Sequence, residues 1–307
     1  MSNRKMLAID IGGTDIKWAV MDDQLCAVRQ GSMANHTASH DDVLQVICRL
    51  KLVISDIRGI GISVPGTIRA DDPTGTVIGG GALPFLDGFA LGKAVETETG
   101  VPTAVLNDGK CGVLGEYGAG SLKGCSSGVV LALGTGVGGG ILLNGSVLQG
   151  FHCFAGEFSF LKVNMQGAFS MENAIGGACS WLKLKHDILT EMNLQDDPKI
   201  NGYKLFEWIE EGNAAAVRGL HQYARSVAEL ILQLEAVVDP EVFVIAGGIS
   251  SRAVLIEAIQ EETQKILDSI PYKQLPLPRI KGAALGNDAN LYGAAMHLRN
   301  MEQHLHQ

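Results

Sequence analysis

Residues 6–21 read MLAIDIGGTDIKWAVM, two apolar runs separated by the turn Gly12-Gly13-Thr14. Each run is short and rich in aliphatic and β-branched residues, which is typical of a strand. Glycine adopts positive φ without a steric penalty, so the two glycines favour a tight turn between the strands. The stretch therefore predicts a β-hairpin, with Asp10 near the end of its first strand.

A second stretch repeats this pattern, since residues 128–143 read GVVLALGTGVGGGILL. Within it, residues 134–139 match the G-x-G-x-x-G pattern of dinucleotide-binding folds, which requires a helix directly after the glycines. The residues that follow form a short apolar run closed by Asn-Gly, so they predict a second hairpin strand. We therefore reject the interpretation as a dehydrogenase.

Both turns have the composition of a phosphate-binding turn. Glycine brings backbone N–H groups close to an anion, and the hydroxyls of Thr14 and Thr135 add short donors. One such turn is equally well explained as a plain hairpin connection. Two near-copies in one chain favour phosphate binding over plain hairpin connections. Two such turns that face each other can clamp a polyphosphate.

The composition fits an α/β protein of two domains with a cleft between them. The 307 residues exceed the length at which one hydrophobic core usually keeps growing. Hydrophobic residues make up 46% and charged residues 19%, which suits well-buried strands. The glycines, 39 in all, lie mainly at predicted strand ends.

Charge and cysteine content exclude several classes of protein. The net charge of -9 and the lack of a Lys/Arg cluster argue against nucleic acid as a partner. No signal peptide and no apolar run long enough to span a membrane occur, so we expect no membrane partner and a cytoplasmic location. The six cysteines are widely spaced and predict free thiols rather than disulfides.

Strands and helices alternate along both halves, which suggests an ancient duplication. Further strands are predicted at residues 25–30, 59–64, 103–106, 242–246 and 279–284. Helices are predicted at residues 41–52 behind an Asp N-cap, 91–97, 180–192, 214–238, 251–267 and 289–301. Asn107 and Asp108 follow one of the buried strands, where Asp108 can be the N-cap of a helix over residues 109–115.

Seven short motifs, in this order, resemble the ROK family of repressors, open reading frames and kinases. They are Asp10-Ile11-Gly12-Gly13-Thr14, Val64-Pro65-Gly66, Asn107-Asp108, residues 133–140, Ala155-Gly156-Glu157, Gly247-Gly248-Ile249 and Gly286-Asn287-Asp288-Ala289. The resemblance implies a duplicated actin-like, hexokinase-type α/β ATPase fold related to ribonuclease H, with two lobes. It also implies that the terminal helix packs on the first lobe. We expect residues 1–120 plus 287–307 to form the smaller N-terminal lobe and residues 121–286 the larger one.

Kinase members of the family transfer the γ-phosphate of ATP to a sugar hydroxyl, commonly O6, with Mg²⁺. The resemblance implies that Asp108 is the catalytic base. It further implies that the sugar is bound by Gly66, Asn107, Asp108, Glu157 and Glu172. ATP and Mg²⁺ are expected at Asp10, Gly12, Gly13, Thr14, Gly134, Thr135, Gly136, Gly247 and Gly248, with Mg²⁺ carried by ATP near Asp10. An ordinary solvated glutamate remains the alternative for both Glu157 and Glu172.

The chain departs from the family at the structural zinc site. Typical ROK kinases place a histidine three residues after the Ala-Gly-Glu glutamate, followed by cysteines, whereas this chain has Phe160 and no cysteine before Glu172. We therefore predict no structural zinc, and we interpret His152 and Cys153 as loop residues. The phenylalanine offers a flatter, less polar wall, which can stack on a second sugar ring or close the pocket.

The zinc-less pattern resembles the bacterial β-glucoside kinases most, so a β-glucoside or hexose is the expected acceptor. N-acetylmannosamine kinase and glucokinase are alternatives within the class, and a non-catalytic, sugar-sensing ROK protein is the alternative of another class. By analogy with the family we expect a homodimer.

Overall fold

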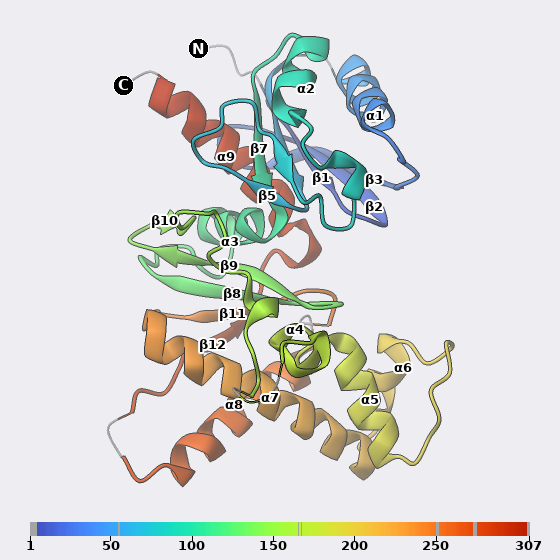
Figure 1. Ribbon diagram of the computed structural model, residues 1–307, viewed down its shortest axis with the longest axis vertical. Helices are drawn as coiled ribbons and strands as arrows, with labels where there is room; N and C mark the ends of the chain where they lie inside the picture. The colour runs from blue at the N-terminus through green and yellow to red at the C-terminus, as the bar shows by residue number, and fades with distance from the viewer. Residues whose placement is uncertain are drawn as a thin grey trace. The chain divides into compact units, whose positions relative to one another are not determined.

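The computed structural model describes residues 5–54, 56–164, 166, 168–249, 252–272 and 275–305 (Figure 1). The chain divides into two compact units. Unit 1 comprises Met1–Gly124, Val147–Ala155 and Asn287–Gln307, and unit 2 comprises Cys125–Ser146 and Gly156–Gly286. The lobe boundaries expected from the sequence remain a prediction.

A five-stranded sheet organises the described part of unit 1, in the order β3-β2-β1-β4-β7. Its strands are β1 (Lys5–Ile11), β2 (Asp15–Met21), β3 (Ala27–Ala34), β4 (Ile57–Val64) and β7 (Thr103–Asn107), and β5 (Thr67–Ile68) pairs separately with β6 (Val77–Ile78). The antiparallel pair β1–β2 confirms the first predicted hairpin, and β4 and β7 continue the sheet in parallel.

Helices cover both faces of this sheet. They are α1 (His40–Val53), α2 (Leu91–Thr99), α3 (Asp108–Ala119) and α9 (Ala289–Leu305), with a 3-10 turn η1 (Pro84–Leu86). Because successive strand residues point to opposite faces, Leu7 and Ile9 pack with Val43 of α1, whereas Met6 and Ala8 pack with α3 and α9. The expected Asp N-cap of α1 is wrong, because the Ser39 side chain caps it.

Two glycines let α3 and α9 approach closely. A Cβ atom on Gly115 of α3 would lie 2.0 Å from the carbonyl oxygen of Ala289, and one on Gly293 of α9 would lie 1.9 Å from that of Cys111. Backbone-to-backbone contact of this kind is available only to glycine. The terminal helix therefore packs closely on unit 1 because these two glycines leave room for backbone contact.

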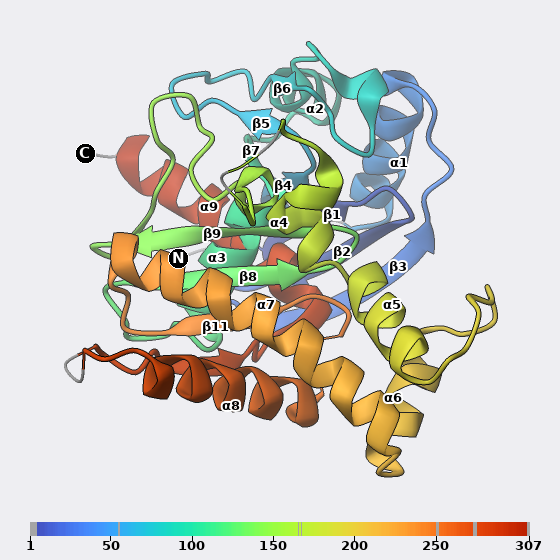
Figure 2. The same ribbon diagram turned by 60° about the horizontal axis from the view of Figure 1, so that its bottom comes forward.

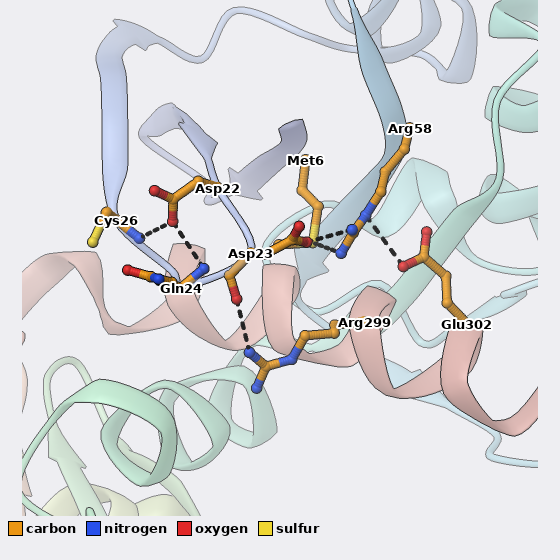
Figure 3. Close-up of polar contacts among 8 residues, drawn as sticks. All are labelled: Met6, Asp22, Asp23, Gln24, Cys26, Arg58, Arg299 and Glu302. Atoms are coloured by element: carbon orange, nitrogen blue, oxygen red, sulfur yellow. Dashed lines mark hydrogen bonds and ion pairs between the residues drawn. The ribbon is translucent and has the colours of Figure 1, made fainter. Parts of the chain in front are cut away.

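Charged groups fasten the far end of α9 to the same unit (Figure 3). Arg58 of β4 donates to the Asp23 carboxylate and forms an ion pair with Glu302 of α9, with 3.2 Å between Nε and Oε2. Arg299 of α9 donates to the backbone oxygen of Asp23 at 3.3 Å. The turn after β2, which holds Asp23, is thus tied to α9 from two positions.

Unit 2 is built on a sheet with the same strand order, β10-β9-β8-β11-β12 among the residues described. Its strands are β8 (Gly128–Leu133), β9 (Val137–Leu143), β10 (Ser146–Val147), β11 (Phe243–Ala246) and β12 (Ile280–Gly282). The antiparallel pair β8–β9 confirms the second hairpin, and β11 pairs in parallel with both β8 and β12. The matching order in the two units supports the predicted duplication.

The helices of unit 2 lie between its strands in the sequence, with α4 to α7 between β10 and β11 and α8 between β11 and β12, and they pack on one another (Figure 2). They are α4 (Ile175–Ala178), α5 (Trp181–Glu191), α6 (Gly202–Glu210), α7 (Ala214–Val238) and α8 (Ala253–Ser269), with 3-10 turns η2 (Phe158–Phe160) and η3 (Met171–Asn173). A further 3-10 turn, η4 (Gly286–Asp288), begins at the last residue of unit 2 and continues into unit 1. Helix α7 has the predicted bounds, whereas α4 and α6 were not predicted. Ser251, the predicted start of α8, lies outside the described residues.

All six cysteines are free, as predicted. Within the part of the chain that the structure describes, no helix combines the length and the apolar character needed to cross a membrane.

Candidate active site

Asp108 begins helix α3 directly after strand β7. The N-cap of this helix is Asn107, whose side-chain oxygen accepts a hydrogen bond of 3.1 Å from the backbone nitrogen of Lys110. The interpretation of Asp108 as the N-cap is therefore wrong, since Asp108 is the first helical residue. A carboxylate is favourable in a first helical turn, because the backbone N–H groups there are partly unpaired.

Two hydrogen bonds orient the Asp108 carboxylate. Its Oδ1 accepts from Nδ2 of Asn107 at 3.0 Å and from the backbone nitrogen of Gly109 at 2.8 Å. Asn107 Nδ2 also donates to the backbone oxygen of Gly66 at 2.9 Å. Gly66 follows β4, whose last residue, Val64, is paired with Asn107 of β7. The carboxyl ends of two parallel strands thus bring Gly66, Asn107 and Asp108 together.

Asp10 is a buried carboxylate one residue before the end of β1, with 9% of its surface exposed. Its Oδ1 accepts hydrogen bonds from Oγ of Ser63 at 2.7 Å and from Nδ2 of Asn290 at 3.1 Å. Burial raises the pKa of Asp10, while the two hydrogen bonds and the charge of Lys17 oppose the shift. The pKa of Asp10 remains above its ordinary value, because burial outweighs the hydrogen bonds and the charge of Lys17.

The first glycine turn is held from outside by Asn35, which follows β3. Its Nδ2 donates to the Gly12 carbonyl oxygen at 2.6 Å, and its backbone nitrogen donates to the Thr14 carbonyl oxygen at 2.7 Å. Gly12 closes the turn with a 2.9 Å bond from its nitrogen to the Asp15 carbonyl. Gly13 and Thr14 are exposed at the tip, so their polar groups are accessible to a ligand.

Lys110 is almost fully buried two residues after Asp108, with 1% of its surface exposed. Its Nζ donates to the backbone oxygen of Cys153 at 2.5 Å, and Cys153 has a positive φ of 56°.

The next residue, Cys111, is a buried thiol. Burial and the charges of Asp10 and Asp108 raise its pKa well above its ordinary value. Cys111 is therefore an inert core thiol.

The second glycine turn is braced by Ser159. Its Oγ accepts from the Val137 nitrogen at 2.9 Å and lies 3.1 Å from the Val137 carbonyl oxygen. A Cβ on Gly136 would lie 2.8 Å from the same Oγ, so only glycine fits without displacing Ser159. Gly134 donates to the Gly136 carbonyl at 2.9 Å, and Thr135 is exposed between them.

Gly247 and Gly248 follow strand β11 of unit 2. Gly247 has a φ of 101°, and a Cβ there would lie 2.2 Å from the carbonyl oxygen of Leu133, the residue before the second glycine turn. Space around the Cα of Gly248 is open. The structure thus brings Gly247 against the base of the turn that contains Gly134 to Gly136.

Glu157 and Glu172 flank a loop of unit 2. Glu157 is partly buried and precedes η2, whereas Glu172 lies in η3 and is exposed. Phe160 is 53% exposed at the end of η2. The residues described contain no cluster of three His, Cys, Asp or Glu side chains suited to a metal ion. The lack of a structural zinc stays a prediction.

The predicted site residues fall into two groups. Unit 1 holds Asp10, Gly12, Gly13, Thr14, Gly66, Asn107 and Asp108, and unit 2 holds Gly134, Thr135, Gly136, Glu157, Glu172, Gly247 and Gly248. Their roles remain predictions. The sequence analysis missed Ser63, Asn290 and Ser159, which support these groups through side-chain hydrogen bonds. Asn290 directly follows a recognised motif, whereas no sequence signal marks Ser63 or Ser159.

Relatives and solved structures of similar chains share this architecture. A beta-glucoside kinase of Listeria innocua is 30% identical over 97% of this chain and 98% of its own. A ROK family protein from Streptococcus pneumoniae in complex with sucrose superposes with a TM-score of 0.86 at 25% identity, over 98% of this chain and 99% of its own. A ROK family glucokinase from Streptomyces griseus in complex with glucose and AMPPNP superposes with a TM-score of 0.80 at 25% identity, over 96% of this chain and 99% of its own.

These similarities confirm the predicted actin-like, duplicated α/β fold. The model of the ROK family matches residues 6–300. Because that match spans nearly the whole chain, the protein belongs to the ROK family.

Proposed function

We propose that this protein transfers the γ-phosphoryl group of ATP to a sugar hydroxyl, with O6 of a β-glucoside or hexose as the acceptor. The class of ATP-dependent carbohydrate kinase is supported by relatives named beta-glucoside kinase and glucokinase, which align over almost their full lengths. The observation that carries the proposal is the oriented Asp108 carboxylate directly after β7, which accepts a hydrogen bond from Asn107.

Asp108 is assigned the role of general base. As the sugar oxygen forms its bond to the γ-phosphorus, the bond from phosphorus to the bridging oxygen of ADP breaks, and the hydroxyl proton passes to Asp108. The hydrogen bonds to Oδ1 hold the carboxylate in one orientation, so it needs little reorganisation when the hydroxyl arrives. General-base assistance contributes about 10² to 10⁴ in rate.

The residues around Asp10 fit magnesium carried by ATP. Mg²⁺ in kinases is usually held by one or two carboxylates together with phosphates and water, so a dedicated protein cage is not needed. A buried carboxylate with a raised pKa suits a nearby cation, because the charge of the cation favours the ionised form of the carboxylate. Bound Mg²⁺ would neutralise phosphate charge during transfer, and Gly13 and Thr14 would contact the phosphates.

The acceptor is tested with a panel of sugars. Purified protein with Mg-ATP is assayed on glucose, N-acetylmannosamine, cellobiose and gentiobiose, and ADP release is measured. We expect the highest kcat/KM on a β-linked disaccharide. A strong preference for glucose or N-acetylmannosamine would replace the β-glucoside assignment with glucokinase or N-acetylmannosamine kinase, and position-specific NMR of the product would report whether O6 is phosphorylated.

A sugar sensor without catalysis is the competing function. Both glycine turns and Asp108 are present, but their presence does not establish turnover. A protein that binds sugars in calorimetry and releases no ADP on any acceptor would support the sensor and contradict the kinase.

A further inference from the structure

A loop of unit 2 that holds both candidate sugar carboxylates, Glu157 and Glu172, also exposes large apolar side chains. We call the described part of residues 157–173 the aromatic loop. Phe160 and Phe169 are 53% and 50% exposed. Other exposed apolar side chains of this loop are Leu161, Val163 and Met171. Clustered exposure of this kind marks a binding surface more often than a plain solvent face.

The two phenylalanine rings form a stacked, near-parallel pair. Their centroids are 6.3 Å apart and their planes differ by 14°. Aromatic pairs favour stacked arrangements, yet half of each side chain is left in solvent. The pair therefore leaves the exposed parts of two near-parallel apolar rings available to a ligand.

Backbone hydrogen bonds connect the two ends of the aromatic loop. The backbone nitrogen of Val163 donates to the Asn173 carbonyl oxygen at 3.0 Å, and the backbone nitrogen of Ile175 donates to the Leu161 carbonyl oxygen at 2.7 Å. Buried Phe158, at 3% exposure, anchors the strand side of the loop. These bonds join the two ends of the loop at its base.

The chain places a carboxylate three residues from each ring. Glu157 precedes Phe160, and Glu172 follows Phe169. Carboxylates accept hydrogen bonds from sugar hydroxyls, whereas the axial C–H groups of an equatorially substituted pyranose form an apolar face that suits an aromatic surface. Hydroxyl recognition and ring stacking are thus combined in one loop.

We propose that Phe160 and Phe169 form the platform for the second ring, or aglycone, of a β-glucoside acceptor. This inference rests on the proposed function and names its specificity-determining residues. A monosaccharide has no second ring to stack, so the platform raises the efficiency with disaccharides and aryl glucosides alone. The platform provides affinity for the acceptor and takes no part in the proton or phosphoryl transfer.

The test compares cellobiose with glucose in Phe160→Ala, Phe169→Ala and the double variant. We expect kcat/KM for cellobiose to fall about tenfold in the double variant, mainly through KM, while that for glucose changes less than about threefold. Tyr272→Ala is the matched control, because Tyr272 is an aromatic of the same unit with 74% exposure outside the loop. It should leave both sugars unchanged.

Equal losses on both sugars, or no loss on either, would overturn the platform. The exposed rings could instead be covered by a second copy of the chain. Sedimentation of each variant tests this, and an oligomer that dissociates in the double variant would also overturn the platform. If the wild type phosphorylates no sugar, the proposed function fails separately. Calorimetric binding of cellobiose by wild type and double variant then decides whether the platform exists.

Discussion

Asn290 of the terminal helix donates a hydrogen bond of 3.1 Å to Oδ1 of Asp10 in the first strand. Residues 280 positions apart in the sequence therefore share one buried carboxylate. The hydrogen bond lowers the pKa of Asp10 and only partly offsets the larger effect of burial. The chain keeps a carboxylate where burial disfavours its charge, which is typical of a site that binds a cation or reacts.

Substitution of Asp10 by Asn should stabilise the free protein and inactivate it. The pKa of Asp10 is raised in the folded state, so the folded chain binds the proton more tightly than the unfolded chain, and ionisation above about pH 4 costs stability. Removing the charge should raise the melting temperature at pH 7.5. Loss of the cation contact should lower kcat/KM for ATP by about 10²-fold or more.

Differential scanning fluorimetry and an ADP-release assay check both effects. Asp15→Asn is the control, because Asp15 is an exposed aspartate in the same hairpin. It should change neither property. A lower melting temperature for Asp10→Asn, or activity retained at the wild-type level, would contradict the role given to Asp10.

Substitution of Gly115 by Ala should separate α3 from α9. A Cβ there would meet the Ala289 carbonyl oxygen at 2.0 Å, so the helices must move apart, with an expected loss of about 2–3 kcal/mol in the free energy of unfolding. Gly202→Ala is the matched control, because Gly202 begins α6 and a methyl group added there would have no neighbouring atom within 4 Å. Urea denaturation of both variants measures the difference, and equal stabilities would refute the packing argument.

His297 of α9 should make stability depend on mildly acidic pH. Burial lowers the pKa of His297 to about 4 from 6.5, against an opposing hydrogen bond with the Val105 backbone. Between these two pH values the unfolded chain binds more protons, so stability rises with pH across the window and is complete above it. The contribution is at most about 3 kcal/mol.

His297→Gln should flatten this dependence. Urea denaturation at pH 4.5 and pH 7.0 gives the free energy of unfolding of wild type and variant. We expect this free energy to decrease less in the variant when the pH falls from 7.0 to 4.5. Identical losses would show that His297 is not the titrating group.

The hairpins were predictable because their signals are local. Alternating apolar runs around Gly12 and Gly134 specify strand, turn and strand without help from distant residues. Helix α7 was predicted to the residue, since its apolar spacing lies between the cap Asn213 and Asp239 in the left-handed region. Where two capping residues stand close together, as Ser39 and Asp41 do, composition does not decide which one caps.

The supporting contacts of the candidate site were not predictable. Ser63 and Asn290 reach Asp10 from β4 and α9, and Ser159 reaches the second glycine turn from η2. Such pairs depend on how strands and helices are packed, which no periodicity in the sequence reports. The same holds for the stacked rings of Phe160 and Phe169, of which only the first was singled out from the sequence.

The measurement that tests the central claim most directly is the turnover of Asp108→Asn on the best sugar of the wild type. Asn keeps the size of the side chain and an oxygen that accepts from Asn107 and Gly109, but it cannot take up the hydroxyl proton. We predict a fall in kcat of about 10² to 10⁴, with the dissociation constant of the sugar changed less than about threefold. A variant that retains the wild-type kcat would contradict the assignment of Asp108 as the base.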